Sequence, residues 1–354
     1  MSDVYIPLQR ITYFFSTVLR KAGVREDVAQ YVSEGIVQAS LRGIDSHGIR
    51  LFPHYLQGLV EGRLNKNPQY RFTVTSVSTA KLDADHSPGH AAGATGMLKA
   101  IALAKESGTG AVAVFNSSHF GAAAYYALMA AREDMIGISF THATAHVLSY
   151  GGTRPFLGNN PICLAAPCYG EEPFCLDMAT TVATFNKVQQ HREQGLRVPL
   201  GWGVDSAGMD TEDPGNVESL LPIGGYKGFG LSMMVDILCG LLTGAPYGPH
   251  VSRMFGTPMS DKRLLGHFFM ALRIDCFEDP MVFKKRLKEM MDALRREPPR
   301  DAAVPVQVPG DPEKAFSRER SRTGIPVPES LANQLSALAR EYGVPFEFSS
   351  EGSR

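Results

Sequence analysis

Apolar residues recur at helical spacing through the first sixty residues of the chain. The strongest repeat places five apolar side chains on one face of residues 8–22, namely Ile11, Phe14, Phe15, Val18 and Leu19. Gly23 follows as a helix stop signal. The same reasoning predicts helices over residues 26–41 and 52–62, so the N-terminal part is expected to be largely helical.

At about residue 70 the spacing of apolar side chains changes from helical to alternating. Phe72, Val74 and Val77 are separated by polar residues, which predicts one or two antiparallel strands. Helices and strands then alternate, as in an α/β core. We predict helices over residues 93–106, 122–132, 182–195, 229–242, 281–294 and 329–342, and strands over residues 111–115, 136–141, 162–165, 174–177 and 267–275. The helix over 229–242 has no polar face and is expected to be buried.

These elements divide the chain into four expected parts. Residues 1–66 form a helical N-terminal segment that carries a Ser-His-Gly motif, and residues 67–297 form an α/β core with the cofactor and substrate site. Residues 298–310 are a Pro-rich linker, and residues 311–354 are a C-terminal helical segment that packs on the N-terminal helices.

Composition restricts the kind of partner. The 354 residues include 35 Lys and Arg against 36 Asp and Glu, so no excess charge attracts the whole chain to nucleic acid or to an anionic membrane surface. The expected partner is a small molecule. Five cysteines without a CxxC pair are expected to be reduced thiols, and no apolar stretch reaches the roughly 18 to 20 residues of a membrane span. We expect a cytoplasmic protein.

The chain lacks the G-x-G-x-x-G fingerprint of a Rossmann domain. Its best glycine-rich candidate is GGYKGFG at residues 224–230, which opens the apolar helix and contains Lys227. Backbone N–H groups and a lysine at a helix start suit an anionic cofactor, and a plain glycine-rich turn is the alternative.

Two histidines lie at element junctions, where proton-transfer groups are often found. His47 lies between two predicted helices with Asp45, Ser46 and Arg50 nearby, and its structural alternative is an exposed capping turn. His119 follows an apolar strand and precedes a helix, which is a favoured catalytic position in α/β sheets, although capping and packing would explain it too.

Other chemistries have little support in the sequence. The pairs at residues 86 and 90 and at residues 142 and 146 have zinc-like spacing, but the first contains Pro and Gly and the second lacks further ligands. No G-x-S-x-G segment supports a serine nucleophile.

Six segments, taken together, resemble the malate/L-lactate dehydrogenase family in order and spacing. They are SHGIR (46–50), NSSHFGAA (116–123), GNNP (158–161), LDMATT (176–181), GGYKGFGLSMMVD (224–236) and VPGDPE (308–313). The family also contains sulfolactate, ureidoglycolate and diketogulonate oxidoreductases and a cyclic-imine reductase. The resemblance implies a homodimer with the L-sulfolactate dehydrogenase-like fold, a mixed-sheet α/β core that binds NAD or NADP without a Rossmann domain.

The resemblance also implies roles for individual residues. Arg50 would bind the substrate carboxylate together with Ser46, and His47 and His119 match the two histidines assigned to proton transfer in different members. The cofactor would contact three groups of residues: Asp177, Met178, Ala179 and Thr180; Lys227 and Gly228; and Gly310, Asp311 and Pro312. Two departures bear on cofactor preference: Asn159 replaces the usual Thr, and Asn186 replaces the usual Gly before Lys187.

The implied reaction is hydride transfer between the nicotinamide and a small 2-hydroxy or 2-oxo acid. Such a reaction needs a carboxylate clamp and a group that exchanges the hydroxyl proton, which either histidine could be. Ureidoglycolate dehydrogenase is the alternative within the family, because residues 241–255 and 266–269 resemble that branch, and a cyclic-imine carboxylate reductase is another. A non-catalytic nucleotide or small-acid sensor is the alternative outside it.

Overall fold

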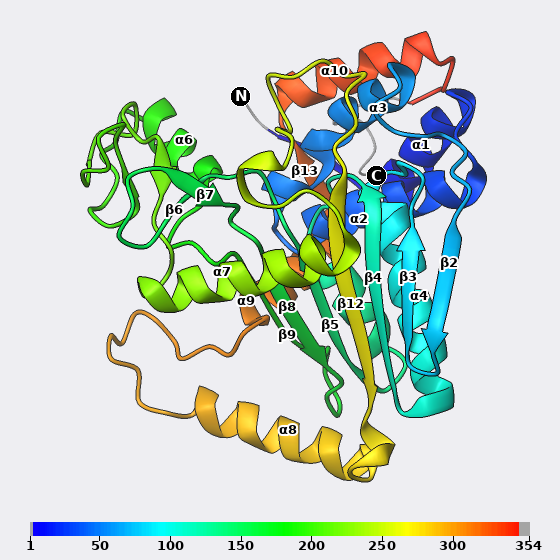
Figure 1. The fold of residues 1–354 in the computed structure, drawn as a ribbon, viewed down its shortest axis with the longest axis vertical. Coiled ribbons are helices and arrows are strands. Elements are labelled where there is room, and N and C mark those ends of the chain that lie inside the picture. Colours follow the sequence, from blue (N-terminus) through cyan, green and yellow to red (C-terminus); the bar gives the residue numbers. More distant parts are fainter. Residues whose placement is uncertain (1–2, 347–354) are drawn as a thin grey trace.

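The computed structural model describes residues 3–346, and its centre is a seven-stranded sheet of order β2-β3-β4-β12-β5-β8-β9 (Figure 1). Within this sheet β3 and β4 run parallel and the other neighbours are antiparallel. The strands are β2 (Arg71–Ser76), β3 (Thr79–Asp83), β4 (Thr109–Ser117), β12 (Leu265–Arg273), β5 (Met135–Thr141), β8 (Ile162–Ala166) and β9 (Phe174–Met178). The mixed sheet confirms the expected fold class.

The central strand β12 has two different faces. Phe269 and Ala271 are fully buried on the face that packs against α4 (Gly89–Ser107) and α5 (Ala124–Ala131). On the other face, a Cβ at Gly266 would lie 1.9 Å from the Cys239 carbonyl oxygen at the end of α7 (Tyr226–Cys239), which crosses the front of the sheet in Figure 1. Phe268 and Met270 on that side are only half-buried. The α7 side is therefore the less completely covered one.

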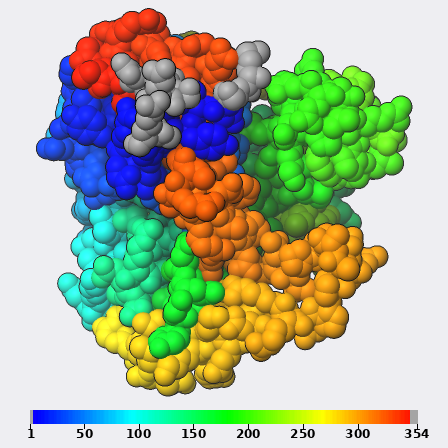
Figure 2. Space-filling view, turned by 180° about the vertical axis from the view of Figure 1, so that it is seen from behind, coloured from blue at the N-terminus to red at the C-terminus, as the bar shows by residue number. Residues whose placement is uncertain are grey.

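The two ends of the chain form a second core beside the sheet. Helices α1 (Leu8–Lys21), α2 (Glu26–Leu41) and α3 (Phe52–Val60) pack with α10 (Glu329–Glu341), and β1 (Val4–Ile6) pairs antiparallel with β13 (Ile325–Val327). Figure 2 shows these blue and red segments in contact. Helix α9 (Asp311–Thr323) lies against α2. The four-part division of the chain stays a prediction, and residues 1–2 and 347–354 of its first and last parts lie outside the described residues.

A small lobe projects from one side of the molecule, drawn green in Figures 1 and 2. It contains α6 (Phe185–Glu193) and a four-stranded sheet of β10 (Gly203–Val204), β11 (Ser219–Leu220), β6 (Val147–Leu148) and β7 (Pro155–Leu157). Val188, Val198 and Leu220 form its own small core. Helix α8 (Pro280–Arg295) lies at the end of the molecule opposite α1 and α10 (Figure 1), and residues 296–310 between α8 and α9 contain no helix or strand.

Two expectations about the apolar helix are wrong. Although the helix over residues 229–242 was expected to be buried, Met233, Ile237 and Leu241 are between 43% and 55% exposed. It was also expected that no apolar stretch reaches the length of a membrane span. The stretch Tyr226–Thr243 is long and apolar enough by composition to do so, and 39% of it is buried in the protein. A helix that is apolar on all sides is expected to be covered on all sides. The sheet covers only one side of α7, so the residues on its other side are exposed.

Candidate active site

A cavity of about 450 Å³ lies where the N-terminal helices meet the sheet and the green lobe. Its walls contain four of the predicted site residues, Ser46, His47, Arg50 and His119. These residues come from two segments more than sixty positions apart, and the fold brings them together. Their chemical roles stay predictions. The geometry of each side chain shows which of its atoms could contact a ligand.

The Ser-His-Gly turn is shaped by a close approach to α2. It consists of the short 3₁₀ turns Asp45–His47 and Ile49–Leu51. At the start of the second turn, the Ile49 N–H donates a 3.0 Å hydrogen bond to Ser40 Oγ. A Cβ at Gly48 would lie 2.0 Å from the same oxygen, so only glycine fits without a shift. The close approach of Ser40 thus explains why position 48 of the motif is a glycine.

Helix α9 fastens this turn from the far end of the sequence. Arg320 donates hydrogen bonds of 2.7 and 2.9 Å to the two carboxylate oxygens of Asp45, and it also bonds the Ser40 carbonyl oxygen. A two-point guanidinium–carboxylate contact fixes orientation as well as distance. Sequence reasoning missed Arg320 because α9 has no strong apolar face to mark it.

The two predicted histidines face each other in the cavity wall. Their rings are stacked with centroids 5.5 Å apart and planes 24° from parallel. His47 Nδ1 and Ser46 Oγ are hydrogen-bonded at 2.8 Å, which fixes the orientation of that ring. Both rings line the cavity, so a ligand bound there can be reached by the edge of either ring.

Tyr55 on α3 positions His119. Its phenol oxygen lies 2.6 Å from His119 Nδ1, and no hydrogen bond within residues 3–346 is formed by Nε2 of the same ring. Nδ1 is thus occupied and Nε2 remains available for a ligand. Sequence reasoning missed Tyr55, whose only signal was a polar atom on the apolar face of a short helix.

Burial sets the protonation state of this pair. Loss of solvent lowers the pKa of His47 to about 4. The pKa of His119 lies well below its usual value, mainly through burial and further through repulsion by His47, His90 and Arg263. Both rings are neutral at pH 7 and can accept a proton.

A third histidine of the cavity wall is held in one tautomer. His142 Nε2 accepts a 2.8 Å hydrogen bond from the Gly266 N–H, so the proton of the neutral ring is on Nδ1, which lies 3.6 Å from Asp236 Oδ1 on α7. Sequence reasoning singled out His142 only as one of a zinc-like pair. Among the described residues no group of three or more metal-ligating side chains gathers.

The predicted cofactor residues at the end of β9 lie next to the cavity without forming its wall. Asp177 Oδ2 accepts a 2.8 Å hydrogen bond from the Ala124 N–H at the start of α5, and burial raises the pKa of Asp177 to about 6. Thr180 donates through N–H and Oγ1 to the carbonyl oxygen of Asn159, which lines the cavity. Asn186, the second departure from the family pattern, lines it as well.

The glycine-rich start of α7 fits an anionic group. Gly224 and Gly225 have φ of +61° and +63°, which favours glycine at both positions. A Cβ at Gly228 would lie 2.1 Å from the Ile223 carbonyl oxygen, so no side chain covers the backbone at these three positions. The Ile223 N–H donates to the Thr180 carbonyl oxygen, which joins this turn to the segment after β9. Lys227 is exposed and forms no ion pair with any described residue. The donor set therefore suits the phosphates of a dinucleotide.

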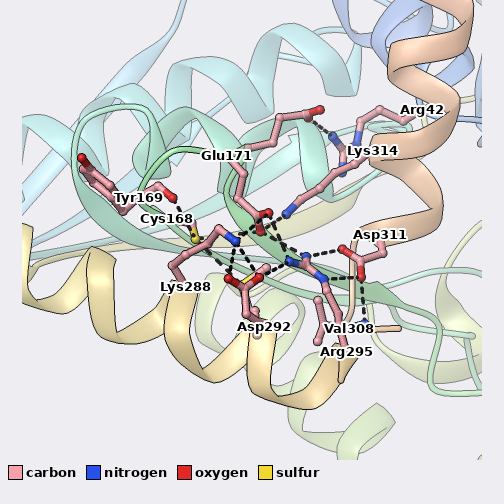
Figure 3. A network of polar contacts seen from close by, with 12 residues as sticks. Arg42, Cys168, Tyr169, Glu171, Lys288, Asp292, Arg295, Val308, Asp311 and Lys314 are labelled. Atoms are coloured by element: carbon pink, nitrogen blue, oxygen red, sulfur yellow. Dashed lines mark hydrogen bonds and ion pairs between the residues drawn. The ribbon is translucent and has the colours of Figure 1, made fainter. Parts of the chain in front are cut away.

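The third predicted cofactor segment is anchored by the charge network drawn in Figure 3. Arg295 on α8 bonds both Asp311 oxygens and both Glu171 oxygens, and Lys314 reaches Glu171 from α9. Gly310, with φ of +97°, packs against the backbone of Cys175 on β9. The segment with Pro312 thus lies beside the strand that carries Asp177, and the Asp311 carboxylate has a structural partner.

Comparison with known proteins agrees with this fold and these motifs. The family model for malate/L-lactate dehydrogenase matches residues 6–336. A malate dehydrogenase of Pyrococcus abyssi is 38% identical over 351 residues, 96% of each chain, and a ureidoglycolate dehydrogenase (NAD(+)) of Escherichia coli is 34% identical over 317 residues, 90% of each. The crystal structure of malate dehydrogenase from Entamoeba histolytica superposes with a TM-score of 0.91 at 31% identity, covering 97% of this chain and 99% of that one.

This mixed-sheet core is the fold of solved malate and sulfolactate dehydrogenases. The chain belongs to the malate/L-lactate dehydrogenase family, and the resemblance seen in its sequence is confirmed.

Proposed function

We propose that the chain is an NAD- or NADP-dependent oxidoreductase that transfers a hydride between the nicotinamide and a small 2-hydroxy or 2-oxo acid. The observation that carries this proposal is the stacked pair His47 and His119 in a cavity that also contains Arg50. Relatives named as NAD(+) and NADP(+) dehydrogenases support the cofactor class.

The substrate acid is oriented by one cation and one hydroxyl of the Ser-His-Gly turn. Arg50 is exposed at the cavity and has no ion-pair partner among the described residues, so its planar fork is free for a carboxylate. Ser46 supplies a hydroxyl beside it. When bound, the nicotinamide supplies or accepts the hydride.

Proton transfer falls to His119 in this proposal. Tyr55 accepts a hydrogen bond from Nδ1–H, which leaves the Nε2 lone pair toward the cavity, where it takes the hydroxyl proton during oxidation and returns it during reduction. The Tyr55 oxygen then stabilises the charged ring. His47 polarises the same substrate oxygen through Nε2, because its Nδ1 is hydrogen-bonded to Ser46.

The cofactor would be held by three neighbouring stretches. Asp177, Met178, Ala179 and Thr180 follow β9, and Lys227 and Gly228 open α7 beside them. Gly310, Asp311 and Pro312 complete the set on the far side of β9. Lys227 would pair with a phosphate, because it is the exposed cation at the glycine-rich turn.

The test is absorbance at the reduced-nicotinamide band. NADH and NADPH are offered with pyruvate, oxaloacetate and a cyclic imine, and the oxidised cofactors with malate, lactate and ureidoglycolate. We expect NADH or NADPH to be oxidised when a 2-oxo acid is present. Cofactor binding without turnover of any compound would contradict the proposal and favour the sensor alternative.

Ureidoglycolate oxidation is the second candidate. Residues 241–255 resemble that branch, and the structure places Met254 and Phe255 of this stretch in the cavity wall. Turnover of ureidoglycolate above that of malate would favour it.

We further propose that two copies pair through α7. Tyr226, Met233 and Ile237 of α7 and Leu241 in the turn after it are exposed at spacings of seven, four and four positions, which places them along one face. A stripe of this kind on a helix that also borders the cofactor turn suits a partner of the same sequence. Five free cysteines suit a reducing compartment, so we propose that the homodimer is cytoplasmic.

A further inference from the structure

One buried arginine ties the N-terminal helices to the loop that precedes β12. Arg63 follows α3, is 3% exposed, and donates five hydrogen bonds of 2.7–3.1 Å, all to oxygens of residues 254–261. The acceptors are the carbonyl oxygens of Met254, Thr257, Pro258 and Asp261 and the hydroxyl oxygen of Thr257. All three nitrogens of the Arg63 guanidinium are thus bonded to one loop.

This loop has little regular structure to hold its backbone. Residues 251–264 contain no helix or strand, and within residues 252–264 the bond from the Asp261 N–H to the Pro258 carbonyl oxygen is the one backbone–backbone hydrogen bond. Arg63 supplies the donors that a neighbouring strand or helical turn would otherwise supply. Lys262 adds one bond in the other direction, to the Gly62 carbonyl oxygen at 2.6 Å. The conformation of the loop therefore depends on the end of α3.

The same loop forms one wall of the substrate cavity. Met254, whose carbonyl oxygen accepts a 2.8 Å hydrogen bond from Arg63, lines the cavity together with Phe255. The ring centroids of Phe255 and His54 on α3 are 4.9 Å apart, and Phe255 is 63% exposed, which places it at the mouth of the cavity. The loop is thus attached to α3 at two points, at Arg63 just after the helix and at His54 within it.

The reacting groups of the proposed function are held by other contacts. His47 Nδ1 is hydrogen-bonded to Ser46, and His119 Nδ1 to Tyr55, and none of these residues belongs to the loop. A displaced loop should therefore weaken the enclosure of the substrate without removing a group that exchanges a proton.

We propose that Arg63 is a positioning residue for substrate binding, which holds residues 254–261 against α3 as a preformed wall of the cavity and so determines how tightly the acid binds. This inference rests on the proposed function. A lysine has the same charge, but its three donors are on one nitrogen, so it cannot bond the four carbonyl oxygens from separate directions as the planar guanidinium does. The loop thus requires the shape of the arginine as well as its charge.

Steady-state kinetics with the best 2-oxo acid and its cofactor tests this role. We expect Arg63→Gln to raise KM for the acid by about 10- to 100-fold and to change kcat only a few-fold, because substrate binding is weakened and the reacting groups stay in place. Arg63→Lys should recover only a small part of the loss. A fall in kcat with an unchanged KM, or full recovery by lysine, would overturn the inference.

A variant on the loop side keeps the proposal testable if Arg63→Gln does not fold. Thr257→Val removes one acceptor of Arg63, at 2.9 Å, with little change in side-chain volume. KM should rise by about 2- to 10-fold, as for the loss of one hydrogen bond to a charged group. An unchanged KM in Thr257→Val and in Arg63→Lys would contradict the positioning role.

The matched control is Arg253→Gln, because Arg253 is an exposed arginine of the same loop. It removes the same charge and should leave KM unchanged. A rise in KM equal to that of Arg63→Gln would point to charge and not to position, and would overturn the assignment to Arg63.

Amide hydrogen exchange measures the loop itself, without turnover. In Arg63→Lys, amides of residues 251–264 should exchange faster than in the wild type, while residues 46–50 and 116–123 keep their rates. Unchanged exchange in the loop overturns the inference and leaves the dehydrogenase proposal standing. No turnover of any acid by the wild-type enzyme contradicts the dehydrogenase proposal itself.

Discussion

The phenol oxygen of Tyr55 lies 2.6 Å from Nδ1 of His119, and the two rings are within 19° of parallel. This contact joins a helix of the N-terminal core to the end of a central strand. It occupies one histidine nitrogen and leaves the other free, and burial keeps the pKa of Tyr55 above its usual range, so the phenol stays neutral.

Removal of the Tyr55 hydroxyl should slow the reaction without removing the histidine. We expect Tyr55→Phe to lower kcat by about 10- to 100-fold, which is the value of a hydrogen bond to a charged ring. The pH profile of kcat should also shift to lower pH, because the charged His119 loses its acceptor. A change in KM alone, with kcat and its pH profile unaltered, would contradict this positioning role.

Substitution of the histidines should separate their roles. His119→Gln is expected to lower kcat by about 10²- to 10⁴-fold, as for loss of a proton-transfer group, and His47→Gln by less. Single-turnover rates with a saturating substrate measure the chemical step. The reverse order of the two effects would transfer the proton-exchange role to His47.

The contact between Arg320 and Asp45 should act on both stability and catalysis. We expect Arg320→Gln and Asp45→Asn each to lower kcat/KM and the free energy of unfolding, with a coupling energy of roughly 0.5–3 kcal/mol in the double-mutant cycle. Denaturant unfolding measures the stability term. Strictly additive effects would show that the pair does not act as a unit.

Acidification should destabilise the fold through buried neutral histidines. Burial lowers the pKa of His90 and of His267 to about 3, whereas the unfolded value is near 6.5, so the unfolded state binds more protons between these limits. Stability is therefore full above about pH 6.5 and is lost as pH falls toward 3. Each ring should remove roughly 2 kcal/mol at pH 5 relative to pH 7.

The measurement is denaturant unfolding from pH 7.5 to pH 4.5. His267→Asn should reduce the slope of stability against pH by the contribution of one proton. An identical slope in wild type and variant would show that His267 does not contribute.

A charged residue in the α7 stripe should separate the two copies. We expect Ile237→Glu to give a monomer in sedimentation experiments at micromolar concentration, because a carboxylate would be buried at the interface. Val77→Glu is the control, since Val77 is 77% exposed in the turn between β2 and β3 and does not belong to the stripe. A wild-type chain that sediments as a monomer would contradict the proposed pairing.

Much of this fold followed from the sequence, where periodicity is strong and local. The helix predicted over residues 26–41 has those bounds in α2, because its apolar positions persist to Leu41. The strands β1 and β13 were missed because each has three residues and forms only when the two chain ends meet. Helix α9 lies in the expected C-terminal helical segment, but its bounds were not predicted because its sequence is mostly polar.

The site was predictable where motifs carry it and hidden where single residues do. The sequence singled out His47, Arg50 and His119, and the structure brings them to one cavity, whereas their roles stay predictions. Arg63 has no motif around it, and its bonds to residues 254–261 join segments about 190 positions apart that meet only in three dimensions. The exposure of α7 was mispredicted because composition does not reveal how far a sheet extends.

The contact of Arg320 with Asp45 spans 275 positions of sequence, and this separation has a consequence for how the protein matures. A ribosome delivers both histidines long before it delivers the arginine that fixes their turn. Chains that end before α9 lack this contact with Asp45, so we expect the Ser-His-Gly turn to reach its final geometry only after α9 has been made and has docked on α2.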